Sequence, residues 1–233
     1  MATMLNLNRI KAISLDLDDT LWPVWPTIER AEQMLHDWLA LNAPLTAQRY
    51  ANPRALREVR DALGQQRPEL VHDLTTLRRE SIRVALASAG EDPQLAEPAF
   101  EVFFEARHEV SFFPDALPAL EALAARFPLV SLTNGNAEIA RVGLGAFFVA
   151  SVAALQVGVP KPHARIFHVA AEAAGVEPEA VLHVGDDALL DVLGARAAGM
   201  QAAWINRERS PWAHPERPHV EAADLTELVR ALT

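Results

Sequence analysis

The stretch Lys11–Thr20, KAISLDLDDT, decides the interpretation of the fold. Its first half is apolar and too short for a helix, and it runs directly into the acidic residues Asp16, Asp18 and Asp19. Similar short apolar runs recur at residues 128–132, 148–152, 180–184 and 201–205. Between them lie segments with helical character, at residues 116–126, 137–142, 163–174 and 188–198. Short strands that alternate with helices predict an α/β fold with a doubly wound, Rossmann-like parallel sheet.

Residues 22–115 show a different pattern. Apolar residues recur there at helical spacing in four groups, and no strand-like alternation is present. One of these groups is an apolar stripe made of Leu70, Leu74, Leu77 and Val84. We therefore predict a catalytic core made of residues 1–21 and 116–233, with an all-helical bundle inserted at residues 22–115.

The composition narrows the classes of function. Acidic residues outnumber basic ones 31 to 21, and the formal charge of −10 argues against nucleic acid as a partner. Cysteine is absent, which excludes disulfides, thiolate metal sites and cysteine nucleophiles. No secretory signal and no apolar stretch of about 20 residues is visible, so we expect no membrane association and a cytoplasmic location. The sequence leaves the oligomeric state open.

Polar residues follow the predicted strands, and the carboxyl ends of parallel strands share one edge of a sheet, where ligands bind. These residues are Asp16 and Asp18 after the first strand, Thr133 and Asn134 after the second, Lys161 before a crossover helix, and Asp186, Asp187 and Asp191 after the fourth. Two like charges about 4 Å apart cost roughly 4 kcal/mol at an effective dielectric near 20. Such crowding requires a compensating cation, and a set of oxygen ligands suits Mg²⁺.

A hard cation, a lysine and a hydroxyl group together favour a phosphate as the bound group. The chain has no glycine-rich phosphate-binding loop, and no serine or cysteine nucleophile lies among these elements. A carboxylate is therefore the available nucleophile, and it would form an acyl-phosphate. A second aspartate two residues later can act as the general acid and then as the general base.

The sequence resembles the haloacid dehalogenase-like (HAD) phosphohydrolases. Four motifs carry the resemblance in the family's order: ISLDLDDT, LVSLTNGN, the lysine of VPKPHARIF, and LHVGDDALLD. The resemblance implies a Mg²⁺-dependent phosphatase whose helical insert is a cap of the C1 type. It assigns the nucleophile and a metal ligand to Asp16, the general acid/base and a backbone metal ligand to Asp18, phosphoryl binding to Thr133, Asn134 and Lys161, metal binding to Asp186 and Asp187, and the orientation of Lys161 to Asp191.

A narrower resemblance concerns the substrate. The runs DLDDTLW, RPELVHDLT and VLHVGDDALLD are similar to a bacterial group of phosphatases in riboflavin synthesis. That group acts on 5-amino-6-(5-phospho-D-ribitylamino)uracil and on FMN, which implies a small phosphorylated metabolite as the partner. Trp22, Trp25, Asn136 and His72 are weaker candidates for substrate specificity, and ordinary packing or turn formation explains them equally well.

Two alternatives remain. A 2-haloacid dehalogenase could use the same scaffold, but the dehalogenases of the family lack an aspartate at the position of Asp18. A non-hydrolytic phospho-acceptor module, similar to response-regulator receivers, also combines acidic residues, Mg²⁺, a threonine and a lysine. Receivers are single small domains, so the helical insert argues against this alternative.

Overall fold

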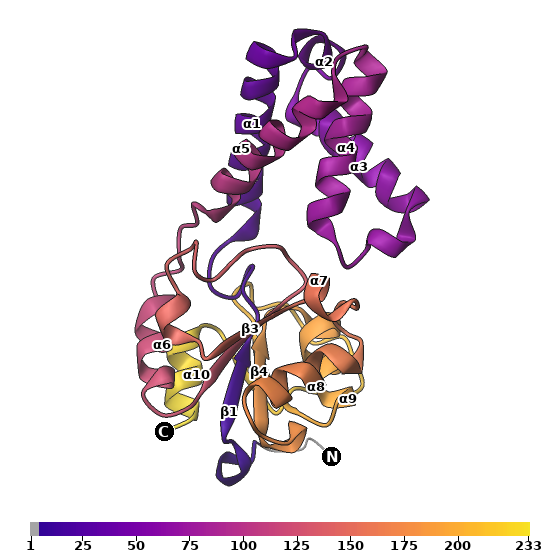
Figure 1. Ribbon diagram of the computed structural model, residues 1–233. Coiled ribbons are helices and arrows are strands. Elements are labelled where there is room, and N and C mark those ends of the chain that lie inside the picture. Colours follow the sequence, from indigo (N-terminus) through magenta and orange to yellow (C-terminus); the bar gives the residue numbers. More distant parts are fainter. Residues whose placement is uncertain (1–4) are drawn as a thin grey trace. The chain divides into compact units, whose positions relative to one another are not determined.

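The computed structural model describes residues 5–233 (Figure 1). The chain divides into two compact units. One contains the described residues up to Pro23 together with Ser111–Thr233, and the other is Val24–Val110. We describe each unit by itself.

The first unit is built on a six-stranded parallel sheet. Its strands are β1 (Ala12–Leu15), β2 (Leu129–Thr133), β3 (Ala150–Ala153), β4 (Val181–Gly185), β5 (Gln201–Ile205) and β6 (Val220–Ala222). The strand order is β3-β2-β1-β4-β5-β6, so the chain reverses its direction of winding between β1 and β4. Every residue of β1, β2, β4 and β5 is buried, as expected for a parallel sheet covered on both faces. The predicted fold class is confirmed.

Helices cover the two faces of this sheet (Figure 1). On one face α6 (Ala116–Ala124) packs against α10 (Leu225–Ala231), and on the other α8 (Ala164–Ala173) packs against α9 (Gly194–Ala197). The core under α8 joins Val130 and Leu132 of β2 to Phe167. Short helices complete the unit: η1 (Leu7–Arg9), η4 (Gly145–Phe147), α7 (Ala154–Val157), η5 (Pro178–Ala180) and η6 (Ala188–Leu193).

Three details of this unit differ from the sequence analysis. Residues 137–142 form turns and not a helix, because the segment spans less than two helical turns and runs into Gly143 with φ +82°. The helix expected at residues 188–198 is a π-helix, η6, continued by the short α9. β6 was not predicted, because three residues of mixed polarity carry no periodic signal.

The second unit is all-helical. Its helices are α1 (Val24–Asn42), α2 (Pro44–Arg49), α3 (Pro53–Gln66), α4 (Leu74–Ala89) and α5 (Ala96–His108), with η2 (Pro68–Leu70) and η3 (Pro93–Leu95) between them. Side-chain caps fix the starts of α3 and α4, where Asn52 and Asp73 accept backbone N–H groups. The stripe predicted on α4 is wrong in part, because Leu74 and Val84 are exposed, whereas Leu77 is buried with Ile82, Ala85 and Leu86.

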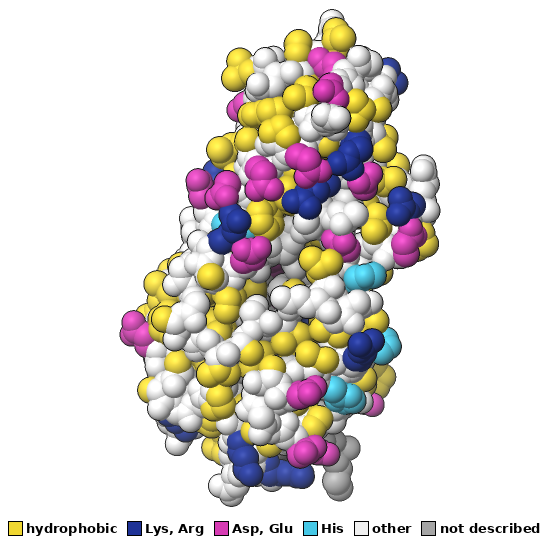
Figure 2. All heavy atoms as spheres, in the orientation of Figure 1, with side chains coloured by type: hydrophobic (Ala, Val, Ile, Leu, Met, Phe, Trp, Pro, Cys, Tyr) yellow, Lys and Arg dark blue, Asp and Glu magenta, His cyan; other side chains and the backbone are white. Residues whose placement is uncertain are grey.

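Acidic and basic side chains are interspersed on the visible surface of the helical unit (Figure 2). Arg79 and Arg83, for example, both pair with Glu97. Among residues 5–233, none of the helices combines the length and the apolar character needed to cross a bilayer.

Candidate active site

The centre of the sheet brings residues distant in sequence to one edge. β1 lies between β2 and β4, and all three run in the same direction. Asp16 follows β1, and its N–H donates to the carbonyl of Val184 in β4 at 2.9 Å. Thr133 is the last residue of β2, and Asp186 follows the last residue of β4. This edge is where the winding reverses, which is the position of ligand sites in doubly wound folds.

Lys161 joins two carboxylates at this edge. Its Nζ lies 2.6 Å from Asp16 Oδ1 and 2.6 Å from Asp191 Oδ1, and the residue is 3% exposed. The side chain of Asn134 holds the lysine backbone from both sides, because its Oδ1 accepts the Lys161 N–H at 2.7 Å and its Nδ2 donates to the Lys161 carbonyl at 3.0 Å. The amide of Asn134 is thus engaged in placing Lys161.

Asp191 is fixed by three donors. Its Oδ1 accepts from Lys161 and from His183 Nε2 at 3.1 Å, and its Oδ2 accepts the N–H of Asp187 at 3.0 Å. Burial lowers the pKa of His183, so the ring is neutral, and we assign its proton to Nε2 because Asp191 accepts there. Ser14 Oγ then donates to His183 Nδ1 at 2.8 Å. The contacts form one buried chain from Ser14 to Asp16.

Three carboxylates crowd together beside the lysine. One oxygen from each of Asp16, Asp186 and Asp191 lies within 4.8 Å of the other two. Burial, followed by the charges of Asp191 and Asp19, raises the pKa of Asp186 to about 7. Burial also raises the pKa of Asp16 well above its usual value, with Lys161 opposing the shift. A cation at this place would favour the ionised forms.

The donors suit a hard divalent cation, because all of them are carboxylate oxygens. Asp191 already accepts three hydrogen bonds, so Asp16 and Asp186 are the carboxylates better able to hold an ion. Thr20 Oγ1 donates to Asp186 Oδ1 at 3.1 Å and fixes that side chain.

Asp187 lies apart from this cluster. Its side chain is exposed, and its Oδ1 accepts the N–H groups of Leu189 and Leu190 at 2.7 Å each, which caps η6. Within the described residues, the group of mutually close carboxylates consists of Asp16, Asp186 and Asp191, and Asp187 is not part of it. A metal contact of Asp187 stays a prediction.

The other predicted site residues lie partly in the sheet unit and partly in the helical unit. Thr133 is buried, and its Oγ1 accepts the N–H of Gly135 at 2.9 Å. Asp18 is half-buried and accepts the indole N–H of Trp22 at 2.8 Å, while Asn136 is half-buried in the loop after β2. Trp25 and His72 belong to the helical unit, where the guanidinium of Arg57 lies 4.3 Å from the centre of the Trp25 ring.

Sequence analysis missed three contributors. It gave no role to His183, Ser14 or Gly185. Ser14, His183 and Gly185 occupy alternate positions of neighbouring strands, which is a signal that they share a face. The link to Asp191 could not be read from the sequence, because it depends on the π-helical winding of η6.

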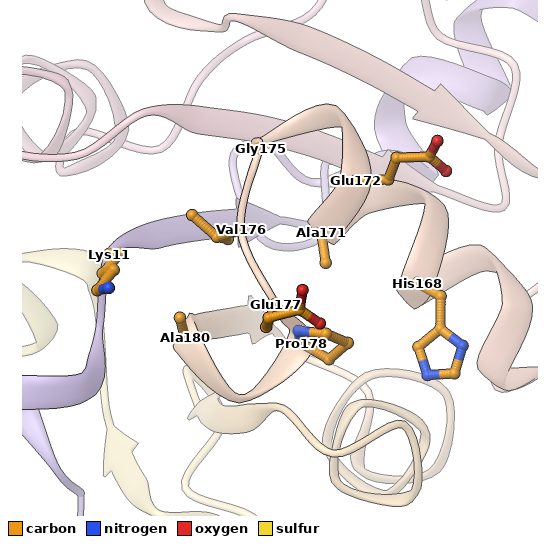
Figure 3. A pocket seen from close by; sticks show the side chains of 9 residues that line it. All are labelled: Lys11, His168, Ala171, Glu172, Gly175, Val176, Glu177, Pro178 and Ala180. Atoms are coloured by element: carbon orange, nitrogen blue, oxygen red, sulfur yellow. The ribbon is translucent and has the colours of Figure 1, made fainter.

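A separate groove of about 720 Å³ lies at the opposite edge of the sheet (Figure 3). Lys11 and Ala180, which precede β1 and β4, contribute to its lining. The side chains of Lys11, Glu172 and His168 point in different directions there (Figure 3).

The buried Asp–Lys–Asp arrangement lies at the edge of the sheet where doubly wound folds bind ligands. The chain matches the haloacid dehalogenase-like hydrolases over residues 10–199, and it belongs to this family. The predicted family and enzyme class are thus confirmed.

Known proteins with the same fold support this placement. The chain is 36% identical over 230 residues to the 5-amino-6-(5-phospho-D-ribitylamino)uracil phosphatase YigB of Escherichia coli (strain K12), covering 95% of this chain and 96% of that protein. Its structure is similar to that of a 2-haloacid dehalogenase from Pseudomonas syringae pv. Tomato DC3000, with a TM-score of 0.87, 39% identity, and coverage of 95% of this chain and 98% of the other. A HAD phosphatase from Thermococcus onnurineus aligns with a TM-score of 0.69 and 25% identity, covering 96% and 98% of the two chains.

Proposed function

We propose that this hydrolase is a Mg²⁺-dependent phosphatase that cleaves phosphomonoesters of small metabolites through an aspartyl-phosphate. The observation that carries the proposal is the position of Lys161. Its ammonium lies 2.6 Å from Asp16, with the carboxylate of Asp186 on the same edge. This arrangement offers a nucleophilic oxygen and the positive charge that a phosphoryl group needs.

Asp16 and Asp186 would hold Mg²⁺, with a backbone carbonyl from Asp18 as the predicted third ligand. The ion would neutralise the phosphoryl oxygens and keep both carboxylates ionised. The raised pKa values of Asp16 and Asp186 support this assignment, since both carboxyls are disfavoured as anions without a nearby cation.

In the first step, a carboxylate oxygen of Asp16 attacks phosphorus, and the bond from phosphorus to the alcohol oxygen breaks. Asp18 gives its proton to that oxygen, so the product leaves as a neutral alcohol. Asp18, now ionised, takes a proton from a water molecule as the water attacks the aspartyl-phosphate. The second step releases inorganic phosphate and restores Asp16. Lys161 and Thr133 bind the phosphoryl oxygens in both steps.

We propose the phosphate ester of a ribitylaminouracil or of a flavin as the substrate class. The support is the similarity to the E. coli phosphatase along 95% of this chain, which includes the helical unit. The helical unit would act as the cap that excludes water and selects the substrate.

A dehalogenase activity is the second candidate, because the Pseudomonas syringae protein, which is 39% identical to this chain, is named a 2-haloacid dehalogenase. The presence of Asp18 favours the phosphatase, since an alcohol leaving group requires a proton and a halide does not.

The test is a set of parallel assays with the purified protein. We expect hydrolysis of p-nitrophenyl phosphate that EDTA abolishes and Mg²⁺ restores, and faster turnover of 5-amino-6-(5-phospho-D-ribitylamino)uracil or FMN than of other phosphate esters in a panel. Hydrolysis that ignores EDTA would contradict the metal assignment. Release of chloride from 2-chloropropionate without any phosphatase activity would favour the dehalogenase.

A further inference from the structure

The buried indole of Trp22 finds its hydrogen-bond partner in a carboxyl group of the candidate site. Trp22 is 0% exposed, so its ring offers no face on which a substrate could stack. Its Nε1 donates to Asp18 Oδ1 at 2.8 Å. Asp18 is the residue to which the proposed function gives the proton transfers.

The backbone around Trp22 holds the indole in place. Asp19 has a left-handed backbone with φ 59°, and its N–H donates to the Trp22 carbonyl at 2.7 Å. The preceding residue, Leu21, accepts the N–H of Phe113 at 2.9 Å. The ring of Phe112 packs edge-on against the Trp22 ring, with the two centres 5.9 Å apart and the planes at 68°. The indole N–H is therefore a fixed donor, and the Asp18 carboxyl adapts to it.

We propose that Trp22 is a positioning residue for Asp18, and that its indole N–H selects the carboxyl oxygen that transfers the proton. This inference rests on the proposed function. An indole nitrogen donates a hydrogen bond and cannot accept one. With the N–H directed at Oδ1, the neutral Asp18 carries its proton on Oδ2. The contact thus fixes both the rotamer of Asp18 and the oxygen presented to the leaving group.

Leaving groups differ in whether they need a proton from Asp18, and this difference tests the proposal. The p-nitrophenolate anion departs without a proton, whereas the alkoxide of an alkyl phosphate needs one from Asp18. Trp22→Phe keeps an aromatic ring in the loop and removes the N–H. We expect kcat/KM for the best primary alkyl phosphate of the panel, which reports the step in which the leaving group departs, to fall about tenfold, as part of the ~10²–10⁴-fold effect of a general acid. We expect kcat/KM for p-nitrophenyl phosphate to change less than about twofold, because its leaving group needs no such acid and kcat/KM does not include the later hydrolysis of the aspartyl-phosphate.

The ratio of the two rates separates positioning from folding. A smaller folded fraction lowers both rates equally and leaves the ratio unchanged. Trp212→Phe is the matched control, because this indole lies in the same unit and, within the described residues, its N–H has no hydrogen-bond partner. We expect a wild-type ratio for Trp212→Phe. Asp18→Asn should show a larger selective loss, and adding Trp22→Phe to it should change the ratio no further.

A second measurement needs no variant of Trp22. In ¹H–¹⁵N spectra of the uniformly labelled protein, Asp18→Asn should move the Trp22 indole resonance and speed its exchange with solvent. An equal loss on both esters, a gain on the alkyl ester, or an indole resonance that ignores Asp18→Asn would overturn the proposal. The spectra require no turnover and the wild-type assays require no variant, so failure of this inference is distinguishable from failure of the proposed function.

Discussion

Lys161 places one ammonium between two buried carboxylates, and this contact is the centre of the candidate site. Burial alone would lower the pKa of a lysine, but Asp16 and Asp191 raise the pKa of Lys161 above its ordinary value. The lysine is therefore charged throughout the physiological range. A permanent positive charge beside Asp16 favours a nucleophilic carboxylate and binds the phosphoryl oxygens.

Asp16→Asn should abolish turnover and leave the fold intact. The amide has nearly the same shape but is not a nucleophile, and we expect kcat to fall by on the order of 10⁴-fold or more. Steady-state assays with p-nitrophenyl phosphate measure the loss, and circular dichroism checks the fold. Asp37→Asn is the control, because Asp37 is exposed on α1. A rate within tenfold of the wild type would remove Asp16 from its role.

The raised pKa of Asp186 leads us to expect that the affinity for Mg²⁺ depends on pH. Burial and the neighbouring charges of Asp191 and Asp19 raise the pKa of Asp186 to about 7. A proton and a cation compete for this carboxylate, so apparent affinity for Mg²⁺ should rise from pH 6 to pH 8. Below the pKa the loss approaches about tenfold per pH unit. Titration calorimetry at several pH values measures the slope. Asp186→Asn should bind weakly at every pH, and an affinity independent of pH would contradict the competition.

For single residues, the sequence located the acidic residues and the lysine, and the family resemblance linked Asp191 to Lys161, but neither gave the contacts of His183 and Asn134. The rule that strand ends share one edge brought Asp16, Lys161 and Asp186 together without coordinates. It could not distinguish Asp187 from Asp191, because the direction of each side chain depends on how η6 winds. The pairing of Asn134 with the lysine backbone also depends on loop geometry that has no periodic signal.

At the scale of elements, the junction between β4 and η6 determines how closely Asp191 approaches the sheet. Gly185 ends β4, and a Cβ atom there would lie 2.3 Å from Asp191 Cγ. A side chain at this position cannot coexist with the observed rotamer of Asp191. The glycine is therefore required by the carboxylate that holds Lys161.

Gly185→Ala should displace Asp191 and weaken both stability and catalysis. We expect a loss of about 1–3 kcal/mol in the free energy of unfolding, as for other overpacked cores, and a fall in kcat because Lys161 loses one of its two partners. Urea denaturation and phosphatase assays measure the two effects. Gly64→Ala in α3 is the matched control, since its Cβ would lie at an ordinary 3.5 Å from Leu77. That change should stabilise the protein slightly. Wild-type activity in Gly185→Ala would show that the junction tolerates a side chain.

Element types were predictable where the apolar pattern was long or fully buried. β5 has the predicted bounds, and α8 differs by one residue at each end from the helix predicted at residues 163–174. The turns at residues 137–142 and the edge strand β6 were not predicted, because segments of three to six residues carry too little periodicity.

At the scale of the whole chain, a clamp joins distant segments of the sheet unit. Arg207, which follows β5, donates to both carboxylate oxygens of Asp115 at 3.0 and 2.9 Å and to the carbonyl of Thr20 at 2.8 Å. Its guanidinium also lies 3.8 Å from the centre of the Phe113 ring. Asp115 in turn accepts the N–H of Leu225 at the start of α10. The clamp thus joins the segment after β1, the segment before α6, the segment after β5 and the start of α10 within this unit.

Asp115→Asn should destabilise the protein in a pH-dependent way. Burial alone would raise the pKa of Asp115, but the hydrogen bonds from Arg207 and Leu225 outweigh it and hold the pKa below its usual value. A lowered pKa stabilises the fold above the unfolded-state value near 3.8, and this contribution is lost as the pH falls through the folded-state value. We expect a deficit of about 1.5–3 kcal/mol at pH 7 that shrinks below about pH 4.

Urea denaturation at several pH values measures this deficit. Asp61→Asn is the control, since Asp61 is exposed on α3 and should change little. A variant as stable as the wild type at pH 7 would show that the clamp contributes nothing.

The distribution of lysine has a practical consequence. The chain contains two lysines, and Lys161 is 3% exposed, whereas Lys11 is exposed just before β1. Reagents that acylate amines would therefore attach to Lys11 among the side chains, at the end of the strand opposite Asp16. A protein tethered to a solid support through that side chain would present its reactive edge to the surrounding solution.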